Sequence, residues 1–75
     1  MTQEVLAAAR RIVSERGGTD RLVSLAELQR DPEIGRLVNT PARLLDIMAD
    51  LQDARQARMV CRHPEPRWYV SAPAL

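Results

Sequence analysis

The sequence predicts a small, mainly helical domain with a β-hairpin near its C-terminus. Several stretches place apolar residues at three- and four-residue spacings, which is typical of amphipathic helices. The last part of the chain instead contains two short runs of β-favouring residues around a proline-rich tip, a pattern that indicates a hairpin. A chain of 75 residues has room for one modest core, so we expect a single domain over residues 1–75.

The composition is that of an ordinary globular protein with an aliphatic core. Apolar residues make up 45% of the chain and charged residues 28%, whereas the aromatic share of 3% consists of Trp68 and Tyr69. The formal net charge of +1 does not by itself indicate a nucleic-acid or membrane partner. Arg is used throughout in place of Lys. Arg suits bidentate contacts with phosphate or guanine, although a genome rich in G and C is the simpler explanation.

The sequence shows no sign of export or membrane insertion. No apolar run approaches the length of a membrane span, and the N-terminus lacks the basic-then-apolar layout of a signal peptide. The single cysteine, Cys61, excludes an internal disulfide, which suits a reducing compartment. We therefore expect a cytoplasmic protein that does not contact a membrane.

The first predicted helix covers residues 2–16. Its apolar stripe consists of Val5, Leu6, Ala9, Ile12 and Val13. Thr2 is expected to cap the start of this helix, and Gly17 and Gly18 to end it in the left-handed conformation. Arg10, Arg11 and Glu15 lie off the stripe.

A second helix is expected over residues 24–30, after a β-favouring run at 21–23. Ser24 and Glu27 have the spacing of a capping box. The helix should end near Arg30, because a proline disfavours helical backbone in the residue before it and Pro32 follows Asp31. Leu25 and Leu28 are expected to face inward. A short extra turn capped by Asp31 would then carry Ile34, Leu37 and Val38 toward the core.

The third helix is expected over residues 40–55. Thr40 is placed to cap it and Pro41 to occupy its first position, where the missing N–H has no cost. The inward side chains are then Leu44, Ile47, Met48 and Leu51. The outward side chains are Ala42, Arg43, Asp46, Ala49, Asp50 and Asp53.

The predicted hairpin spans residues 59–71. Its strands, 59–63 and 67–71, flank the tip Pro64-Glu65-Pro66. Trp68 and Tyr69 must point to opposite faces of their strand, so we expect one ring to be buried and the other partly exposed. The exposed ring would make an amphipathic surface contact or, less simply, stack on a nucleic-acid base.

The order of helix, short strand, helix, helix and hairpin resembles the winged helix-turn-helix DNA-binding family of bacterial, phage and plasmid regulators. The resemblance extends over residues 2–71 and rests on 23–28, 40–45 with Leu51, 59–60 and 67–70. Two departures stand out. Residues 31–39 separate helices that the family joins by a tight turn, and residues 53–58 lack the glycine that the family tends to have before its hairpin. The third helix is therefore free to run further than residue 55.

The resemblance implies sequence-specific binding of double-stranded DNA in transcription regulation. In that family the start of the third helix enters the major groove, with its backbone amides near a phosphate. Arg43 would read bases with Asn39, Thr40 and Ala42 beside it, and the remaining basic residues would hold the backbone. The implied DNA-binding residues are Arg36, Asn39, Thr40, Ala42, Arg43, Arg62, His63 and Arg67. A homodimer through the first helix, with the small Ala7 and Ala8 at the contact, would present two such helices.

Two alternatives compete with DNA binding. Arg43 has Asp46 and Asp50 within pairing distance along the helix, and the acidic outward face would repel phosphates. The domain would then be a protein–protein interaction adaptor whose acidic face meets a basic partner. RNA binding is a weaker third possibility. In these cases the hairpin would only cover the core, and its arginines would lie on its solvent-facing side.

The sequence contains no arrangement of residues that is typical of a catalytic site. Cys61 and His63 share a strand face, but a zinc site needs at least three ligands. No nucleophile stands beside a base, and no glycine-rich phosphate loop is present. We expect no enzymatic activity, no metal and no cofactor.

Overall fold

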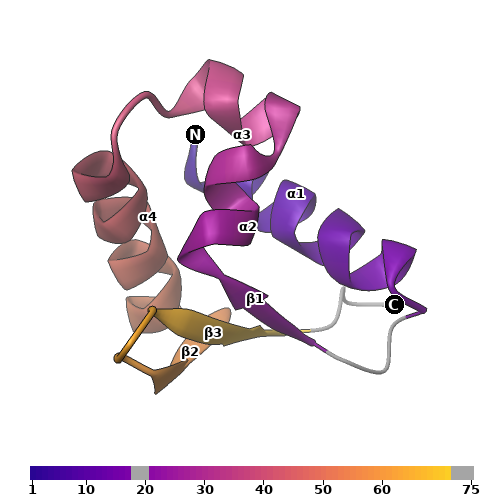
Figure 1. Ribbon diagram of the computed structural model, residues 1–75. Coiled ribbons are helices and arrows are strands. Elements are labelled where there is room, and N and C mark those ends of the chain that lie inside the picture. The colour runs from indigo at the N-terminus through magenta and orange to yellow at the C-terminus, as the bar shows by residue number, and fades with distance from the viewer. Residues whose placement is uncertain (18–20, 72–75) are drawn as a thin grey trace.

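The computed structural model describes residues 1–17 and 21–71. Their elements, in chain order, are α1 (Thr2–Glu15), β1 (Leu22–Ser24), α2 (Leu25–Arg30), α3 (Pro32–Leu37), α4 (Pro41–Asp53), β2 (Ala57–Cys61) and β3 (Arg67–Val70). The helices gather on one side of the small sheet (Figure 1). The predicted mainly helical class with a β-hairpin is confirmed at this level.

The strands form a three-stranded antiparallel sheet in the order β1-β3-β2. β3 is the central strand, and the row Val23, Trp68 and Met59 crosses all the strands. Val23 and Trp68 are buried and Met59 is half-buried, so this row is the inner face that packs against the helices. The sequence predicted the 21–23 run as β-favouring but did not predict that it joins the hairpin.

The core lies between the inner face of the sheet and the helices. The predicted inward side chains of α4 are all at most 2% exposed, as the periodicity required. On α1, Ile12 is only partly buried, and Ala8 is buried although the stripe did not include it. Of the two neighbouring aromatic rings on the second strand of the hairpin, Trp68 is the buried one and Tyr69 is the exposed one.

Helix caps account for most of the element boundaries. Ser24 and Glu27 form the predicted capping box, and Thr40 accepts a hydrogen bond from the Arg43 amide. Asp31 caps α3 in the same way. The expectation for Thr2 is wrong, since α1 already begins at Thr2 and its N-cap is Met1. The Val5 amide donates to the Met1 carbonyl at 3.1 Å, which draws the helix start one residue earlier.

The predicted ranges differ from the observed ones by a few residues. Residue 16 is the C-cap of α1, and residues 24 and 40 are N-caps that do not belong to their helices. The predicted 40–55 helix ends at Asp53, and the hairpin expected over 59–71 has its strands at 57–61 and 67–70.

The end of α4 is a Schellman motif built on Arg55. The Gln56 amide donates to the Leu51 carbonyl at 2.8 Å, and the Arg55 amide donates to the Gln52 carbonyl at 3.0 Å. This closure places Arg55 at a φ of 61°, in the left-handed region that favours glycine. The helix therefore stops here without a glycine, with an arginine in the strained position.

Replacing Arg55 by Gly should stabilise the domain by about 1 kcal/mol, because glycine adopts the left-handed conformation without a Cβ clash. Urea denaturation followed by circular dichroism measures the gain. Arg55→Ala is the matched control, since it removes the same charge but keeps the Cβ. Equal midpoints for the two variants would contradict the prediction.

Candidate nucleic-acid interface

The first turn of α4 and the two residues before it present half of the side chains that the sequence predicted for DNA contact. Asn39, Thr40, Ala42 and Arg43 are all exposed and adjacent in the chain. The Thr40 cap and Pro41 fix the direction in which the helix starts. Arg36, on the last turn of α3, is exposed just before this segment. The local sequence therefore brings these residues together as expected.

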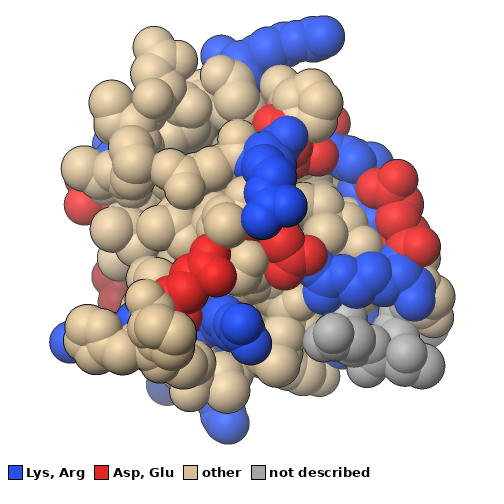
Figure 2. Space-filling view, in the orientation of Figure 1, with Lys and Arg blue, Asp and Glu red and all other residues tan. Residues whose placement is uncertain are grey.

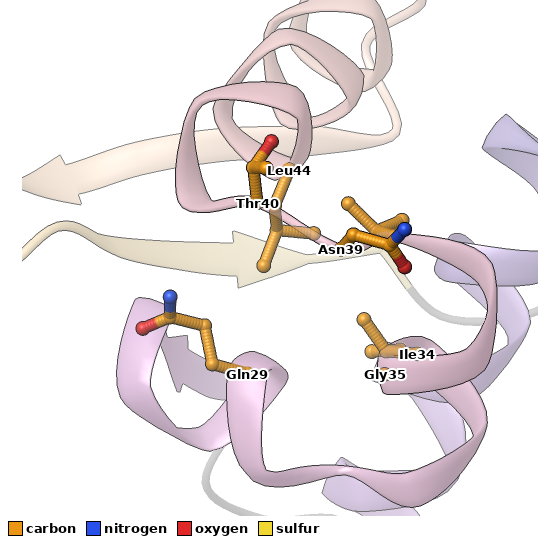
Figure 3. A pocket seen from close by; sticks show the side chains of 7 residues that line it. Gln29, Ile34, Gly35, Asn39, Thr40 and Leu44 are labelled. Carbon is orange, nitrogen blue, oxygen red and sulfur yellow. The ribbon is translucent and has the colours of Figure 1, made fainter.

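A hollow of about 270 Å³ separates the start of α4 from α2 and α3. Figure 3 shows Gln29 of α2 pointing into it, with Asn39 and Thr40 on the opposite side. Ile34 and Leu44 give the hollow apolar walls. Gln29 was not among the predicted residues, and only the folding of α2 against α3 and α4 brings its amide here. Amide and hydroxyl groups around such a hollow are able to donate and accept hydrogen bonds.

The backbone of this turn offers less to an anion than the sequence suggested. Pro41 has no N–H, and the Arg43 amide donates to Thr40 Oγ1 at 3.2 Å. The Leu44 amide donates to the Thr40 carbonyl at 3.1 Å. Within the described chain, Ala42 alone keeps a free amide in the first turn of α4. Binding here must therefore depend on side chains more than on the helix start.

Charge along α4 changes sign after its first turn. Arg43 forms no ion pair with any of the described residues, so the pairing with Asp46 or Asp50 that the sequence allowed is not formed. Asp46, Asp50 and Asp53 are exposed on the following turns. The helix is thus basic at its start and acidic beyond it.

The hairpin tip presents its basic side chains to the solvent. Arg62, His63 and Arg67 are exposed, and no ion pair is present on them in residues 1–17 and 21–71. Glu65, which lies between His63 and Arg67 in the chain, reaches back to α2, where its Oε1 accepts from the Ala26 amide at 2.8 Å. This contact joins residues 39 positions apart, so no local pattern could have revealed it.

On the face shown in Figure 2, blue and red groups lie side by side and form no continuous basic band. This agrees with the net charge of +1. A contact with phosphates must therefore be made by local groups of arginines and cannot rely on a broad positive field.

A buried carboxylate fixes α3, and with it the segment that leads into α4. Asp31 Oδ2 accepts from the Ile34 amide at 3.1 Å, and Oδ1 accepts from Arg11 of α1 at 2.5 Å. Burial raises the pKa of the Asp31 carboxyl, but the hydrogen bonds from Arg11 and Ile34 outweigh burial, and the pKa lies below its ordinary value.

The stability of the domain should therefore decrease in acid through Asp31. Because the pKa of Asp31 is lower in the folded state than in the unfolded chain, its contribution is present above about pH 4 and is lost as the pH falls through the folded-state value. Asp31→Asn keeps a good cap but loses the charge, whereas Asp31→Ala should also lose about 1 kcal/mol of capping. Urea midpoints from pH 7 to pH 3 should converge for wild type and Asp31→Asn at the acidic end, and a constant gap would contradict this assignment.

The predicted dimer face on α1 is partly used within the chain. Arg10 donates to the Ser71 carbonyl and to Gln56 Oε1, each at 3.1 Å, and Arg11 pairs with Asp31 and with Glu15. Ala8 is buried in the core, so only Ala7 of the predicted pair is exposed.

The Cys61 and His63 pair gathers no further ligand. Cys61 Sγ donates to the His63 carbonyl at 2.9 Å. Across residues 1–17 and 21–71, no cluster of three or more His, Cys, Asp or Glu side chains is placed to hold a metal ion.

No family model matches the chain, and no curated protein or solved structure is detectably similar to it. Among the helices of the described residues, none combines the length and the apolar character needed to cross a membrane.

Proposed function

We propose that this chain is a winged helix-turn-helix domain that binds double-stranded DNA by sequence in transcription regulation in the cytoplasm. The order α1, β1, α2, α3, α4, β2, β3 and the sheet order β1-β3-β2 support this assignment. In it, α2 and α4 are the helix-turn-helix pair, α3 is an insertion between them, and the β2–β3 hairpin is the wing.

The observation that carries the proposal is that two elements, the start of α4 and the hairpin tip, are both basic and exposed. Arg43 on the first turn of α4 and Arg62 on the hairpin tip form no ion pair in the described part of the chain. α4 and the β2–β3 turn lie on the same side of the molecule (Figure 1). A duplex on that side can meet both elements at once.

In the proposed complex the start of α4 enters the major groove. Arg43 reads a base edge, with Asn39, Thr40 and Ala42 beside it, and the amide of Ala42 is directed toward a phosphate. Arg36, Arg62, His63 and Arg67 lie along the backbone. Asp50 and Asp53 stand about 10–15 Å further along the helix axis, on the turns of α4 nearest the hairpin (Figure 1), so the duplex must pass these carboxylates between Arg43 and Arg62. A homodimer through α1, with Ala7 at the contact, would place two such helices on neighbouring half-sites.

Selection of bound fragments from random duplex DNA tests this function. We expect enrichment of a defined sequence, and an affinity that falls with a log–log salt slope of about −3, as for three Arg–phosphate contacts. An absence of any duplex binding at about 50 mM salt would overturn the proposal.

A protein adaptor is the second candidate. The exposed carboxylates of Asp46, Asp50 and Asp53, next to a Leu45 that is 37% exposed, favour a basic protein partner for α4. If duplex binding is absent, this function replaces DNA binding.

A further inference from the structure

The face of the sheet turned away from the helices has its own chemistry. Its outward positions include Leu22 on β1, Arg58 and Val60 on β2, and Arg67 and Tyr69 on β3, and Ser24 and Cys61 pair with Arg67 at one end of this face. Figure 1 shows the helices on the opposite side, so none of them covers this face. Val60 is 51% exposed and Tyr69 is 47% exposed. An aromatic ring, aliphatic side chains and arginines therefore share one open surface, which we call the outer sheet face.

Tyr69 lies at the centre of the outer sheet face. It belongs to the middle strand, where its cross-strand partners are Leu22 on β1 and Arg58 on β2. Arg67 lies two residues earlier on the same strand and the same side. The side chains of the directly paired Arg58 and Tyr69 start about 5 Å apart, and residues two positions apart on a strand, such as Arg67 and Tyr69, lie about 7 Å apart. Both arginines therefore lie within the reach of one nucleotide bound at the ring.

The ring is held in place while it remains exposed. Arg21 Nε donates to the Val70 carbonyl at 2.9 Å, and its guanidinium carbon lies 5.9 Å from the centroid of the Tyr69 ring. This contact is within the range of a cation–π interaction. A ring ordered in this way loses little conformational freedom when a flat partner stacks on it.

The charge of the outer sheet face is positive. Its outward positions include no acidic residue, and Arg58 and Arg67 form no ion pair with the rest of the described chain. Glu27 borders a depression of about 290 Å³ that Arg67 and Leu22 also line. The Glu27 carboxylate is already engaged by the Ser24 amide and by Arg16. A negative ligand on this face therefore meets guanidinium groups and no unpaired carboxylate.

We infer that the outer sheet face binds single-stranded DNA. An unpaired base stacks on the face of the Tyr69 ring that Arg21 does not cover, and Arg58 and Arg67 contact the phosphates on either side of it. Leu22 and Val60 contact the sugars. They favour deoxyribose over ribose, because a 2′-hydroxyl pressed against aliphatic side chains would lose its hydrogen bonds to water. A duplex hides the faces of its bases within the stack, so this surface selects single strands.

This site does not depend on the proposed duplex function. The two sites share Arg67, but Tyr69 and Arg58 belong to the outer sheet face alone, and Arg43 and Arg62 belong to the proposed duplex interface alone. Each activity is therefore open to separate removal by substitution.

The experiment is a fluorescence anisotropy titration of a labelled oligothymidylate of about 12 nucleotides. Tyr69→Ala should weaken binding about 10-fold, and Tyr69→Phe should bind within twofold of wild type because stacking needs the ring and not the hydroxyl. Arg58→Ala combined with Arg67→Ala should reduce the salt slope by about 1 to 2. Circular dichroism checks that each variant is folded.

Two comparisons decide the outcome. Arg43→Ala combined with Arg62→Ala should leave oligothymidylate binding within about threefold of wild type, and Tyr69→Ala should leave the affinity for duplex unchanged. Failure of duplex binding alone would overturn the proposed function and leave this inference intact. Equal oligothymidylate affinities for wild type and a folded Tyr69→Ala variant, or an oligouridylate bound as tightly as the DNA, would overturn the inference.

Discussion

Replacing both Arg43 and Arg62 by Ala should lower the affinity for the selected duplex about 100-fold. Arg43 is the side chain on the first turn of α4 with the reach and the free guanidinium to read a base edge, a contact worth about 1–3 kcal/mol. Arg62 contributes a phosphate contact from the hairpin, so its loss should also reduce the salt slope by about 1. Electrophoretic mobility shifts over a series of salt concentrations measure both quantities.

The control variant combines Arg30→Ala with Arg55→Gly. It removes the same charge from exposed positions outside the proposed interface, and glycine suits the left-handed backbone of residue 55. We expect this variant to bind within about threefold of wild type. If both double variants lose affinity equally, Arg43 and Arg62 act only through net charge, and α4 does not read the sequence.

Replacing Trp68 by Ala should remove a large part of the stability of the domain. Trp68 is 1% exposed at the centre of the inner sheet face, and its Nε1 donates to Gln52 Oε1 of α4 at 3.1 Å. Loss of a buried Trp costs about 3–5 kcal/mol. A domain of this size has a total stability of about 4–11 kcal/mol. The variant should therefore be partly or wholly unfolded at 37 °C.

Thermal unfolding followed by circular dichroism measures this loss, because the substitution removes the single Trp of the chain and with it the indole fluorescence. Tyr69→Ala is the matched control in the next residue of the same strand. Its side chain faces outward, so its cost should stay below about 1 kcal/mol. A Trp68→Ala variant as stable as Tyr69→Ala would show that the indole is not a core residue.

The sequence predicts those parts of the fold that depend on neighbouring residues. The capping box at Ser24 and Glu27, the Thr40-Pro41 start and the apolar spacing of α4 all act within a few positions, and each is found in the structure. The prediction that Thr2 caps the first helix was wrong because a helix can also begin without a side-chain cap. Here the Met1 carbonyl supplies the first acceptor.

Contacts between residues far apart in the chain could not be predicted from the spacing of apolar residues. Periodicity places Trp68 and Tyr69 on opposite faces but cannot tell which face meets the helices until β1 has paired with β3. The Glu65 contact with α2 has no local signal either. At the candidate interface, the sequence identified the exposed side chains at the start of α4. It did not show that Thr40 and Pro41 leave the first turn of α4, as the structure describes it, a single free amide.

The hydrogen bonds of Arg10 also bear on where the chain can be shortened. The Arg10 guanidinium bonds both the carbonyl and the hydroxyl of Ser71, and the Ser71 hydroxyl donates in turn to Gln56 Oε1 at 2.9 Å. The Ser71 amide donates to the Gln56 carbonyl at 3.0 Å. A truncation after Val70 removes these bonds together, although every strand residue is retained. We therefore expect a fragment that ends at Ser71 to be more stable than one that ends at Val70.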